Sequence, residues 1–86
     1  MRKSFTIIDE IGLHARPVSI LVGAASRFQN EITIEYKGKK VTLKSIIAVM
    51  SLAVPYNDTF EIEVVGDCAE DIMSALEETM VRNAII

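Results

Sequence analysis

The chain has 86 residues, of which half are apolar and 24% are charged, a composition typical of globular rather than disordered proteins. Its formal net charge of −3 and its pI near 5.0 argue against nucleic acid as a partner, since nucleic-acid binders usually carry a basic face. This length fits a single domain over residues 1–86 and is too short to enclose a large active-site cavity. We therefore expect any chemistry to take place at the surface.

The sequence predicts neither export nor insertion into a membrane. The apolar stretch after the basic start, Ile7-Ile8, is shorter than the about 7–15 residues of a secretory signal. No apolar run approaches the roughly 18 residues that cross a membrane. The lone cysteine, Cys68, excludes an internal disulfide framework and fits a reducing compartment. With one cysteine and one histidine, we expect a cytoplasmic protein with no metal site and no cofactor.

The first part of the chain predicts a strand followed by a helix. Apolar and polar residues alternate over residues 3–8, which is the period of a half-buried strand, and Gly12 then marks a loop. Pro17 suits the first turn of a helix, where a missing N–H is harmless, and we expect this helix to close at Asn30. The buried face of the helix consists of apolar residues at helical spacing: Val18, Leu21, Val22, Ala25 and Phe28.

A hairpin and a short helix are predicted next. Residues 32–36 alternate between apolar and polar, and the turn Lys37-Gly38-Lys39 leads into a partner strand with Val41 and Leu43. Ser45 has the side chain of a helix N-cap and stands at the head of the apolar run 46–52. A turn over residues 55–58 then interrupts the chain.

The last elements are a strand over residues 60–64 and an amphipathic helix from Ala69 to Met80. We expect Asp67 to cap this helix, with Glu70 completing a pair like a capping box. The order of elements is therefore β-α-β-β-α-β-α. Three helices on one face of an antiparallel sheet, an α+β fold with two layers, would bury every apolar stripe.

The most informative motif is Gly12-Leu13-His14-Ala15-Arg16-Pro17, which places the only histidine at or beside a helix N-cap. The first turn of a helix leaves N–H groups without partners and carries about half a positive charge. A phosphate on the imidazole would meet these donors, and Arg16 can hold its oxygens in a bidentate way. The same positive end favours the neutral, nucleophilic ring. A lone histidine before a helix is usually just a surface residue or a weak cap, and it is the six-residue motif that favours the functional reading.

This motif resembles the active-site signature of the HPr family, the histidine-containing phosphocarriers of the bacterial sugar phosphotransferase system. The segment Leu43-Lys44-Ser45-Ile46, followed by Val49-Met50-Ser51-Leu52, resembles the second signature of that family. The spacing between His14 and Ser45, the chain length and the segment from Ala75 to Met80 also agree. The resemblance covers essentially the whole chain.

The resemblance implies an open-faced β-sandwich whose four-stranded antiparallel sheet has the order 1-4-2-3. It implies that His14 accepts a phosphoryl group from enzyme I, with Arg16 as the charge partner, and passes it to sugar-specific permease subunits. Such a protein is a monomeric carrier that shuttles between partners, so the word enzyme describes the system better than this domain. Metabolite-controlled phosphorylation of Ser45 by a serine kinase/phosphatase, read by a catabolite-control regulator, is also implied.

A docking surface is predicted beside the histidine. A short surface helix needs one buried stripe, for which Val49 and Leu52 suffice, so the remaining apolar residues would be exposed. In the family these positions contact enzyme I and other partners. The predicted docking residues are Ile46, Ile47, Met50, Pro17 and Ala15.

Several positions depart from the family pattern. Alanine stands at positions 48 and 53, where glycine is common, and Val18 replaces the usual alanine. The segment Pro55-Tyr56-Asn57-Asp58-Thr59 replaces a turn of small residues. These changes leave His14 and Arg16 untouched but bear on the affinity for partners.

Two other readings of the sequence remain. The first is an HPr-like regulatory paralogue, whose phosphorylation state controls a partner protein rather than sugar transport. The second is an unrelated α+β domain that binds a small ligand or RNA, against which the acidic charge and the lack of aromatic RNA-binding strands argue. Retention of both His14 and Ser45 favours the carrier, or a protein with both roles.

Overall fold

The elements follow the predicted order β-α-β-β-α-β-α in a computed structural model, which describes all residues from Met1 to Ile86. The strands and helices are β1 (Arg2–Thr6), α1 (Ala15–Ala25), β2 (Ile32–Tyr36), β3 (Lys39–Thr42), α2 (Ile46–Met50), β4 (Thr59–Val64) and α3 (Ala69–Arg82).

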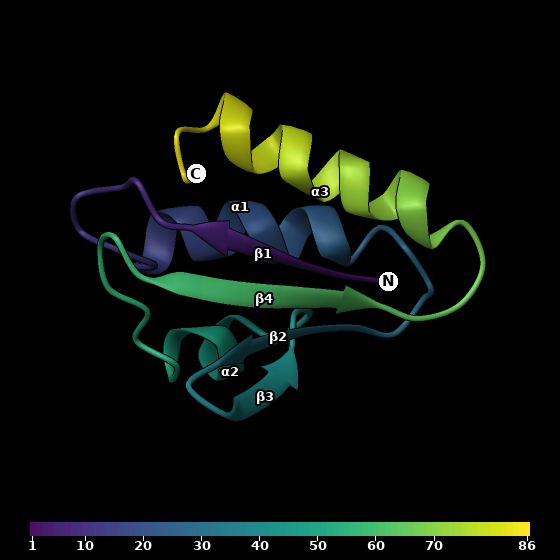
Figure 1. The fold of residues 1–86 in the computed structure, drawn as a ribbon, viewed down its shortest axis with the longest axis horizontal. Coiled ribbons are helices and arrows are strands. Elements are labelled where there is room, and N and C mark those ends of the chain that lie inside the picture. The colour runs from purple at the N-terminus through teal and green to yellow at the C-terminus, as the bar shows by residue number, and fades with distance from the viewer.

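The four strands form one antiparallel sheet in the order β1-β4-β2-β3, and the three helices cover one of its faces (Figure 1). The two inner strands, β4 and β2, pair with each other although β3 and α2 lie between them in the sequence. The register is regular, with Phe5 opposite Phe60 and Ile34 opposite Ile62. This is the open-faced, two-layer α+β fold that the sequence predicted.

The core lies between the sheet and the helices. Every second residue of β4 is buried, and so are Ile32 and Ile34 of β2, which is the alternation expected when one face of a sheet is covered. The helices contribute their apolar stripes to the same cluster, which includes Leu21, Val22, Met73, Leu76 and Met80. Removal of these side chains from water is the main force that holds the two layers together.

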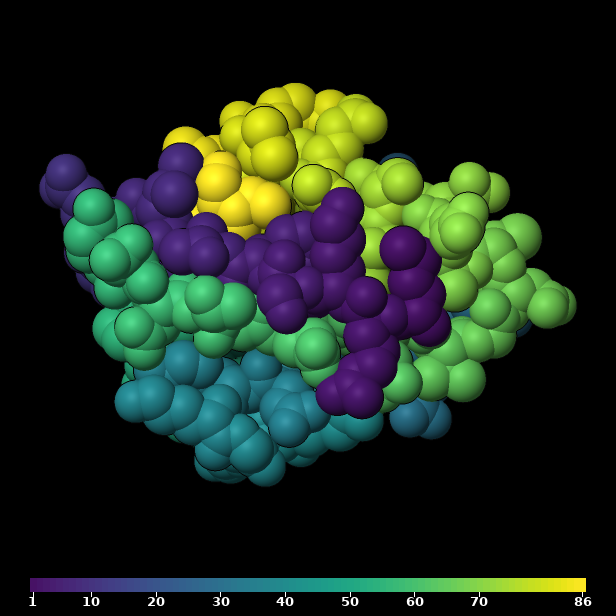
Figure 2. Space-filling model, in the orientation of Figure 1, coloured from purple at the N-terminus to yellow at the C-terminus, as the bar shows by residue number.

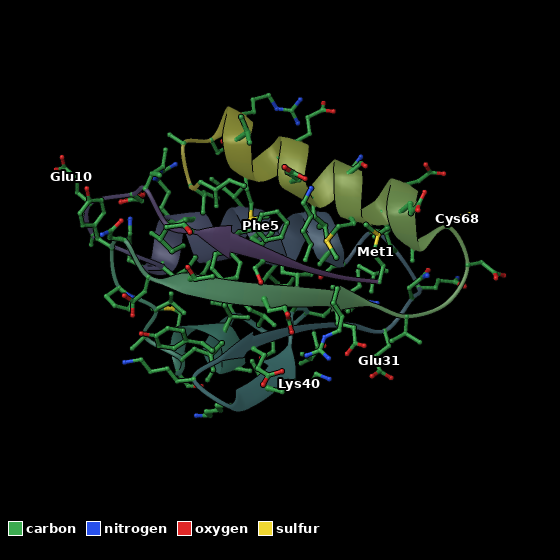
Figure 3. All side chains as sticks on the ribbon, viewed as in Figure 1. Met1, Phe5, Glu10, Glu31, Lys40 and Cys68 are labelled. Atoms are coloured by element: carbon green, nitrogen blue, oxygen red, sulfur yellow. The ribbon has the colours of Figure 1, made fainter.

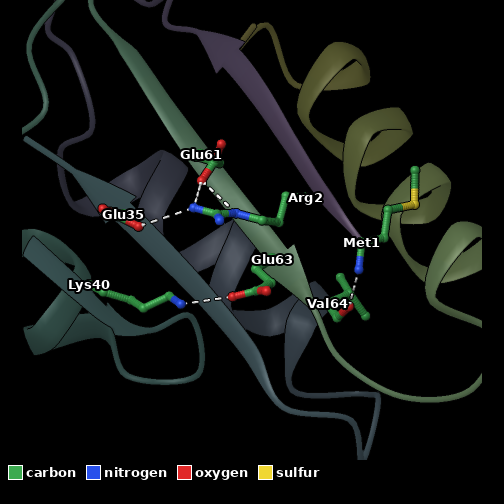
Figure 4. A network of polar contacts seen from close by, with 7 residues as sticks. All are labelled: Met1, Arg2, Glu35, Lys40, Glu61, Glu63 and Val64. Carbon is green, nitrogen blue, oxygen red and sulfur yellow. Dashed lines mark hydrogen bonds and ion pairs between the residues drawn. The ribbon is translucent and has the colours of Figure 1, made fainter. Parts of the chain in front are cut away.

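The opposite face of the sheet is polar and carries a network of ion pairs (Figure 4). Arg2 of β1 binds Glu61 of β4 and lies 3.6 Å from a carboxylate oxygen of Glu35 on β2. Lys40 of β3 reaches across β2 to Glu63 of β4, at 2.7 Å between Nζ and Oε1. These contacts link all four strands on the uncovered face.

The C-terminal residues lie beside the segment that follows β1, at the opposite end of that strand from the N-terminus (Figure 1). The Ile8 N–H donates to the Ile85 carbonyl at 2.9 Å, and the last residues pack against the first segment (Figure 2). Ile85 is fully buried. The C-terminal residues therefore hold in place the segment that leads from β1 to the loop containing His14.

Several predicted boundaries were wrong. The first strand ends at Thr6 rather than at residue 8, and α2 ends at Met50 rather than at residue 52. The first helix ends at Ala25 rather than near Asn30, because Phe28 N–H bonds the carbonyl three residues back instead of continuing the helix. Leu43 lies just beyond β3, although it is buried as the pattern predicted.

The predicted capping pair before α3 was also wrong. The N-cap is Cys68, in the left-handed conformation with φ of 59°, and no side chain caps the helix. The Asp67 carbonyl instead accepts a hydrogen bond from the Asn30 amide at 2.8 Å, so Asn30 ties two loops together. Acidic residues in the first turn, Glu70 and Asp71, complement the helix dipole without capping it.

None of the three helices combines the length and the apolar character required to cross a lipid bilayer.

Candidate functional site

The loop before α1 is fixed by close contact with the segment that follows α2. Gly12 has φ of +84°, and a β-carbon at this position would lie 2.7 Å from the Val54 carbonyl oxygen. The same oxygen accepts the Leu13 N–H at 2.8 Å, and the Leu13 side chain is buried in the core. Glycine is needed here because other residues neither adopt this φ easily nor fit the space. This anchoring sets the position of the next residue, His14.

His14 is the N-cap of α1, as the sequence predicted. Its backbone is extended, its carbonyl accepts the first helical hydrogen bond from Val18 N–H at 3.0 Å, and its side chain makes no capping bond. The N–H groups of Ala15 and Arg16 donate to no group of the chain. The imidazole, with 31% of its side-chain surface exposed, therefore lies beside two free amide donors at the positive end of a helix.

Asp9, to which no sequence motif pointed, lies within reach of both predicted site residues, His14 and Arg16. Its Oδ2 lies 3.3 Å from His14 Nε2 and 3.4 Å from Arg16 Nη2, while its Oδ1 accepts the Ile11 N–H at 3.0 Å. Its side chain is only 12% exposed. The only sign of this contact in the sequence is an acidic residue five positions before the histidine. Whether that carboxylate reaches the ring depends on how the loop between them closes.

The pKa of Asp9 is lowered from its ordinary value. The main cause is the hydrogen bond from Ile11 N–H, which outweighs the partial burial that raises the pKa. The hydrogen bond with His14 and the charges of His14 and Arg16 lower the pKa further. Asp9 is therefore a carboxylate at neutral pH, and it faces the site as a hydrogen-bond acceptor.

Ser45 is the N-cap of α2, as predicted. Its Oγ accepts the Ala48 N–H at 3.2 Å, and its hydroxyl donates to no group of the chain. The oxygen thus satisfies one helix donor while its proton remains unengaged. A five-residue helix depends on such a cap, because most of its backbone groups lie within one turn of an end.

The helix α2 has a buried stripe and an exposed one, as predicted. Val49 and the following Leu52 are buried in the core. The exposed side, which we call the α2 patch, consists of Ile46, Ile47 and Met50, with Ile47 84% exposed. The segment after α2 runs to Val54, which contacts Gly12 and Leu13, so the patch is connected directly to the histidine loop.

Two further predicted docking residues differ in exposure. Ala15 is exposed beside His14, but Pro17 is buried in the core-facing side of α1. Pro17 therefore offers little surface of its own, and its place in the first turn suits the start of the helix. Contact of Ala15 and Pro17 with a partner stays a prediction.

The family model described as the PTS HPr component phosphorylation site matches residues 1–82. The structure is similar to the histidine-containing phosphocarrier protein of Mycoplasma, with 38% identity, a TM-score of 0.95, and coverage of 100% of this chain and 98% of that one. The two sheets and their helices thus follow the same path throughout.

Two other solved structures extend the likeness. The phosphocarrier protein HPr of Bacillus anthracis is 37% identical with a TM-score of 0.83, over 92% of this chain and 94% of that one. Crh, the catabolite repression protein of Bacillus subtilis, which forms a domain-swapped dimer, is 30% identical with a TM-score of 0.73, over 95% and 93%. The chain belongs to the HPr family of phosphocarrier proteins of the phosphotransferase system.

Proposed function

We propose that this protein accepts a phosphoryl group from phospho-enzyme I on His14 and passes it to sugar-specific permease subunits. The observation that carries the proposal is the imidazole at the start of α1, beside the unpaired N–H groups of Ala15 and Arg16. These donors and the Arg16 guanidinium favour a dianionic group on the ring. We take the identities of the phosphoryl donor and of the acceptors from the family to which the chain belongs.

The ring nitrogen that accepts the phosphoryl group is Nδ1 in this proposal. Nε2 lies against the Asp9 carboxylate, which can only accept a hydrogen bond, so the proton of the neutral ring belongs on Nε2. Nδ1 has no partner in the chain and keeps its lone pair. The Nδ1 lone pair can therefore attack phosphorus while the donor protein recovers the electron pair of the broken bond.

The experiment is phosphorylation with phosphoenolpyruvate, Mg²⁺ and enzyme I. The protein is expected to acquire an acid-labile, base-stable phosphate, and His14→Ala is expected to acquire none. Ser74→Ala serves as the matched control and should label like the parent, because it removes an exposed hydroxyl on α3, outside both the His14 loop and the α2 patch. Absence of labelling in the parent protein would reject the carrier function.

We propose that phosphorylation of Ser45 regulates this transfer. The Ser45 hydroxyl is unengaged as a donor and stands at the head of the α2 patch. A phosphate there adds roughly −1.5 to −2 charges, which a helix N-terminus tolerates but an acidic partner docking on the patch would not. Ser45→Asp should accept phosphate more slowly from enzyme I while remaining folded, and an unchanged rate would contradict the proposal.

The alternative function is that of a regulatory paralogue, and the likeness to the catabolite repression protein of Bacillus subtilis favours it. In that case labelling on His14 would be absent or slow, while a serine kinase would still modify Ser45. The same two labelling reactions, with phosphoenolpyruvate and enzyme I or with ATP and the serine kinase, therefore separate the two functions. For the carrier function we propose a cytoplasmic monomer, because a carrier must move between separate partners.

A further inference from the structure

The Asp9 carboxylate is held in one orientation by the loop that contains it. Its Oδ1 accepts the Ile11 N–H at 3.0 Å, and the Gly12 N–H bonds the Asp9 carbonyl at 2.9 Å, which closes a tight turn. The second carboxylate oxygen is therefore directed at His14 Nε2 and at the Arg16 guanidinium, at 3.3 and 3.4 Å. Because only 12% of the Asp9 side chain is exposed, water competes little with these two donors for the carboxylate oxygen.

We infer that Asp9 is a positioning residue for phosphoryl exchange, which keeps a proton on His14 Nε2 while Nδ1 gains and loses the phosphoryl group. The inference rests on the proposed carrier function. An imidazole has two neutral tautomers, and only the one protonated at Nε2 both donates to Asp9 and presents a nucleophilic Nδ1. Asp9 thus selects the reactive tautomer before any partner binds.

The proton remains in place during the forward step. The Nδ1 lone pair forms the N–P bond, and the bond between phosphorus and the donor breaks, with its electron pair passing to the donor protein. No proton leaves Nε2, so the ring becomes positively charged. The Asp9 carboxylate lies next to this new charge and stabilises it.

The same proton makes the return step easy. When the phosphoryl group moves to the next protein, the N–P electron pair returns to Nδ1 and the leaving group is a neutral imidazole. If Nε2 lost its proton beforehand, the leaving group would be an imidazolate anion, which departs far less readily. Asp9 therefore keeps the phosphorylated ring a good donor as well as making the free ring a good acceptor.

Arg16 shares the same carboxylate oxygen and is free to leave it. Its side chain is 56% exposed, and its only ion pair is the one with Asp9, at 3.4 Å. A phosphoryl group on Nδ1 offers a second anionic partner, so the guanidinium can move from the carboxylate to the phosphate oxygens. Asp9 thus also holds Arg16 beside the ring before transfer.

Two variants of Asp9 and one matched control test this role. In Asp9→Asn the amide oxygen can keep the Ile11 N–H, which turns the NH₂ group toward His14 Nε2 and favours the opposite tautomer. Asp9→Ala removes the side chain without imposing a tautomer. Glu10→Gln removes the same negative charge from the neighbouring residue, which points outward at the tip of the loop and contacts neither His14 nor Arg16 (Figure 3).

The tautomer is measured by ¹⁵N NMR of the His14 ring under alkaline conditions. We expect the proton on Nε2 in the parent and in Glu10→Gln, on Nδ1 in Asp9→Asn, and a mixture of the two neutral tautomers in Asp9→Ala. Phosphoryl transfer from phospho-enzyme I and its return to unphosphorylated enzyme I should both slow by at least about tenfold in Asp9→Asn, with a smaller loss in Asp9→Ala. The backbone amide spectrum confirms that each variant is folded.

The inference is overturned if the ring of Asp9→Ala keeps the parent tautomer, or if both Asp9 variants transfer phosphate as fast as Glu10→Gln. Failure of the carrier function gives a different result, namely a parent protein that accepts no phosphate from enzyme I. In that case the tautomer measurement still decides whether Asp9 controls the ring. A variant that fails to fold is replaced by Asp9→Glu, whose longer side chain keeps the charge but should misplace it and slow transfer.

Discussion

Gly12 packs against Val54 with no room for a side chain, since a β-carbon on Gly12 would lie 2.7 Å from the Val54 carbonyl oxygen. The contact joins the loop before α1 to the segment after α2. The loop leads into His14, and the segment leads out of the helix that carries the α2 patch. This glycine therefore helps to set the distance between the nucleophile and the surface on which partners are proposed to dock. A change at this contact should therefore affect both the stability of the protein and the position of His14.

Gly12→Ala should destabilise the protein by at least about 1–3 kcal/mol, the cost of a strained positive φ, with the clash against Val54 adding to it. It should also slow phosphoryl acceptance, because His14 would be displaced. The measurement is urea unfolding at neutral pH. The matched control is Gly23→Ala in α1, where a β-carbon would meet nothing within 4 Å. This change should stabilise the protein by about 0.5–1 kcal/mol. Equal effects of the two changes would contradict this account.

Ala53→Gly should stabilise the protein. Ala53 has φ of +50° just after α2, a left-handed conformation that costs an L-residue about 1–2 kcal/mol. Glycine adopts it freely but loses more chain entropy, so we expect a net gain of about 0.5 kcal/mol. The control is Ala48→Gly inside α2, which should destabilise by about 1 kcal/mol. Thermal unfolding of both variants checks the opposite signs, and a loss of stability in Ala53→Gly would contradict the prediction.

The sequence predicted the fold well, because each apolar stripe had a clear period. The alternating apolar residues of β4 and the helically spaced apolar residues of α1 and α3 can all be buried when helices cover one face of the sheet. The positions of His14 and Ser45 as N-caps followed from local chemistry, which depends on neighbours along the chain. The order of the strands came from the family resemblance rather than from these patterns.

The features that the sequence did not predict depend on contacts between distant segments. Asn30 was read as the end of a helix, but its side chain binds the carbonyls of Val65 and Asp67 across the molecule. That contact replaces the cap expected from Asp67. Asp9 was overlooked for a similar reason, since its approach to His14 exists only when the turn at Gly12 is closed against Val54.

Glu63→Gln should make stability less dependent on pH in the acid range. Lys40 lowers the pKa of Glu63, mainly through a hydrogen bond and then through its charge. A carboxylate whose pKa is lower in the folded state stabilises it above the unfolded pKa of about 4.3, and this contribution disappears as the pH falls through the lowered value. The variant should therefore be less stable than the parent at neutral pH and should approach it in strong acid.

The measurement for Glu63→Gln is a series of urea unfolding curves from neutral to acid pH. Glu31→Gln is the control, since Glu31 is exposed and its carboxylate forms no ion pair in the chain. We expect the difference in unfolding midpoint from the parent to shrink with acid only for Glu63→Gln. Added salt should reduce the same difference at neutral pH, because the pair with Lys40 lies on the open face of the sheet. A difference that is independent of pH would show that Glu63 acts through packing instead.

Ile47→Ala should weaken docking of enzyme I without unfolding the protein. Ile47 is 84% exposed on α2, so its truncation removes little from the core and should change stability by no more than about 0.5 kcal/mol. If a partner buries this side chain, its loss removes about 1.5–3 kcal/mol of binding, which corresponds to at least about a tenfold fall in kcat/KM for phosphoryl transfer. Val81→Ala is the matched control, because Val81 is 58% exposed on α3, outside the α2 patch. Steady-state transfer from enzyme I at several concentrations of each variant measures the effect, and equal rates for the two variants would remove Ile47 from the docking surface.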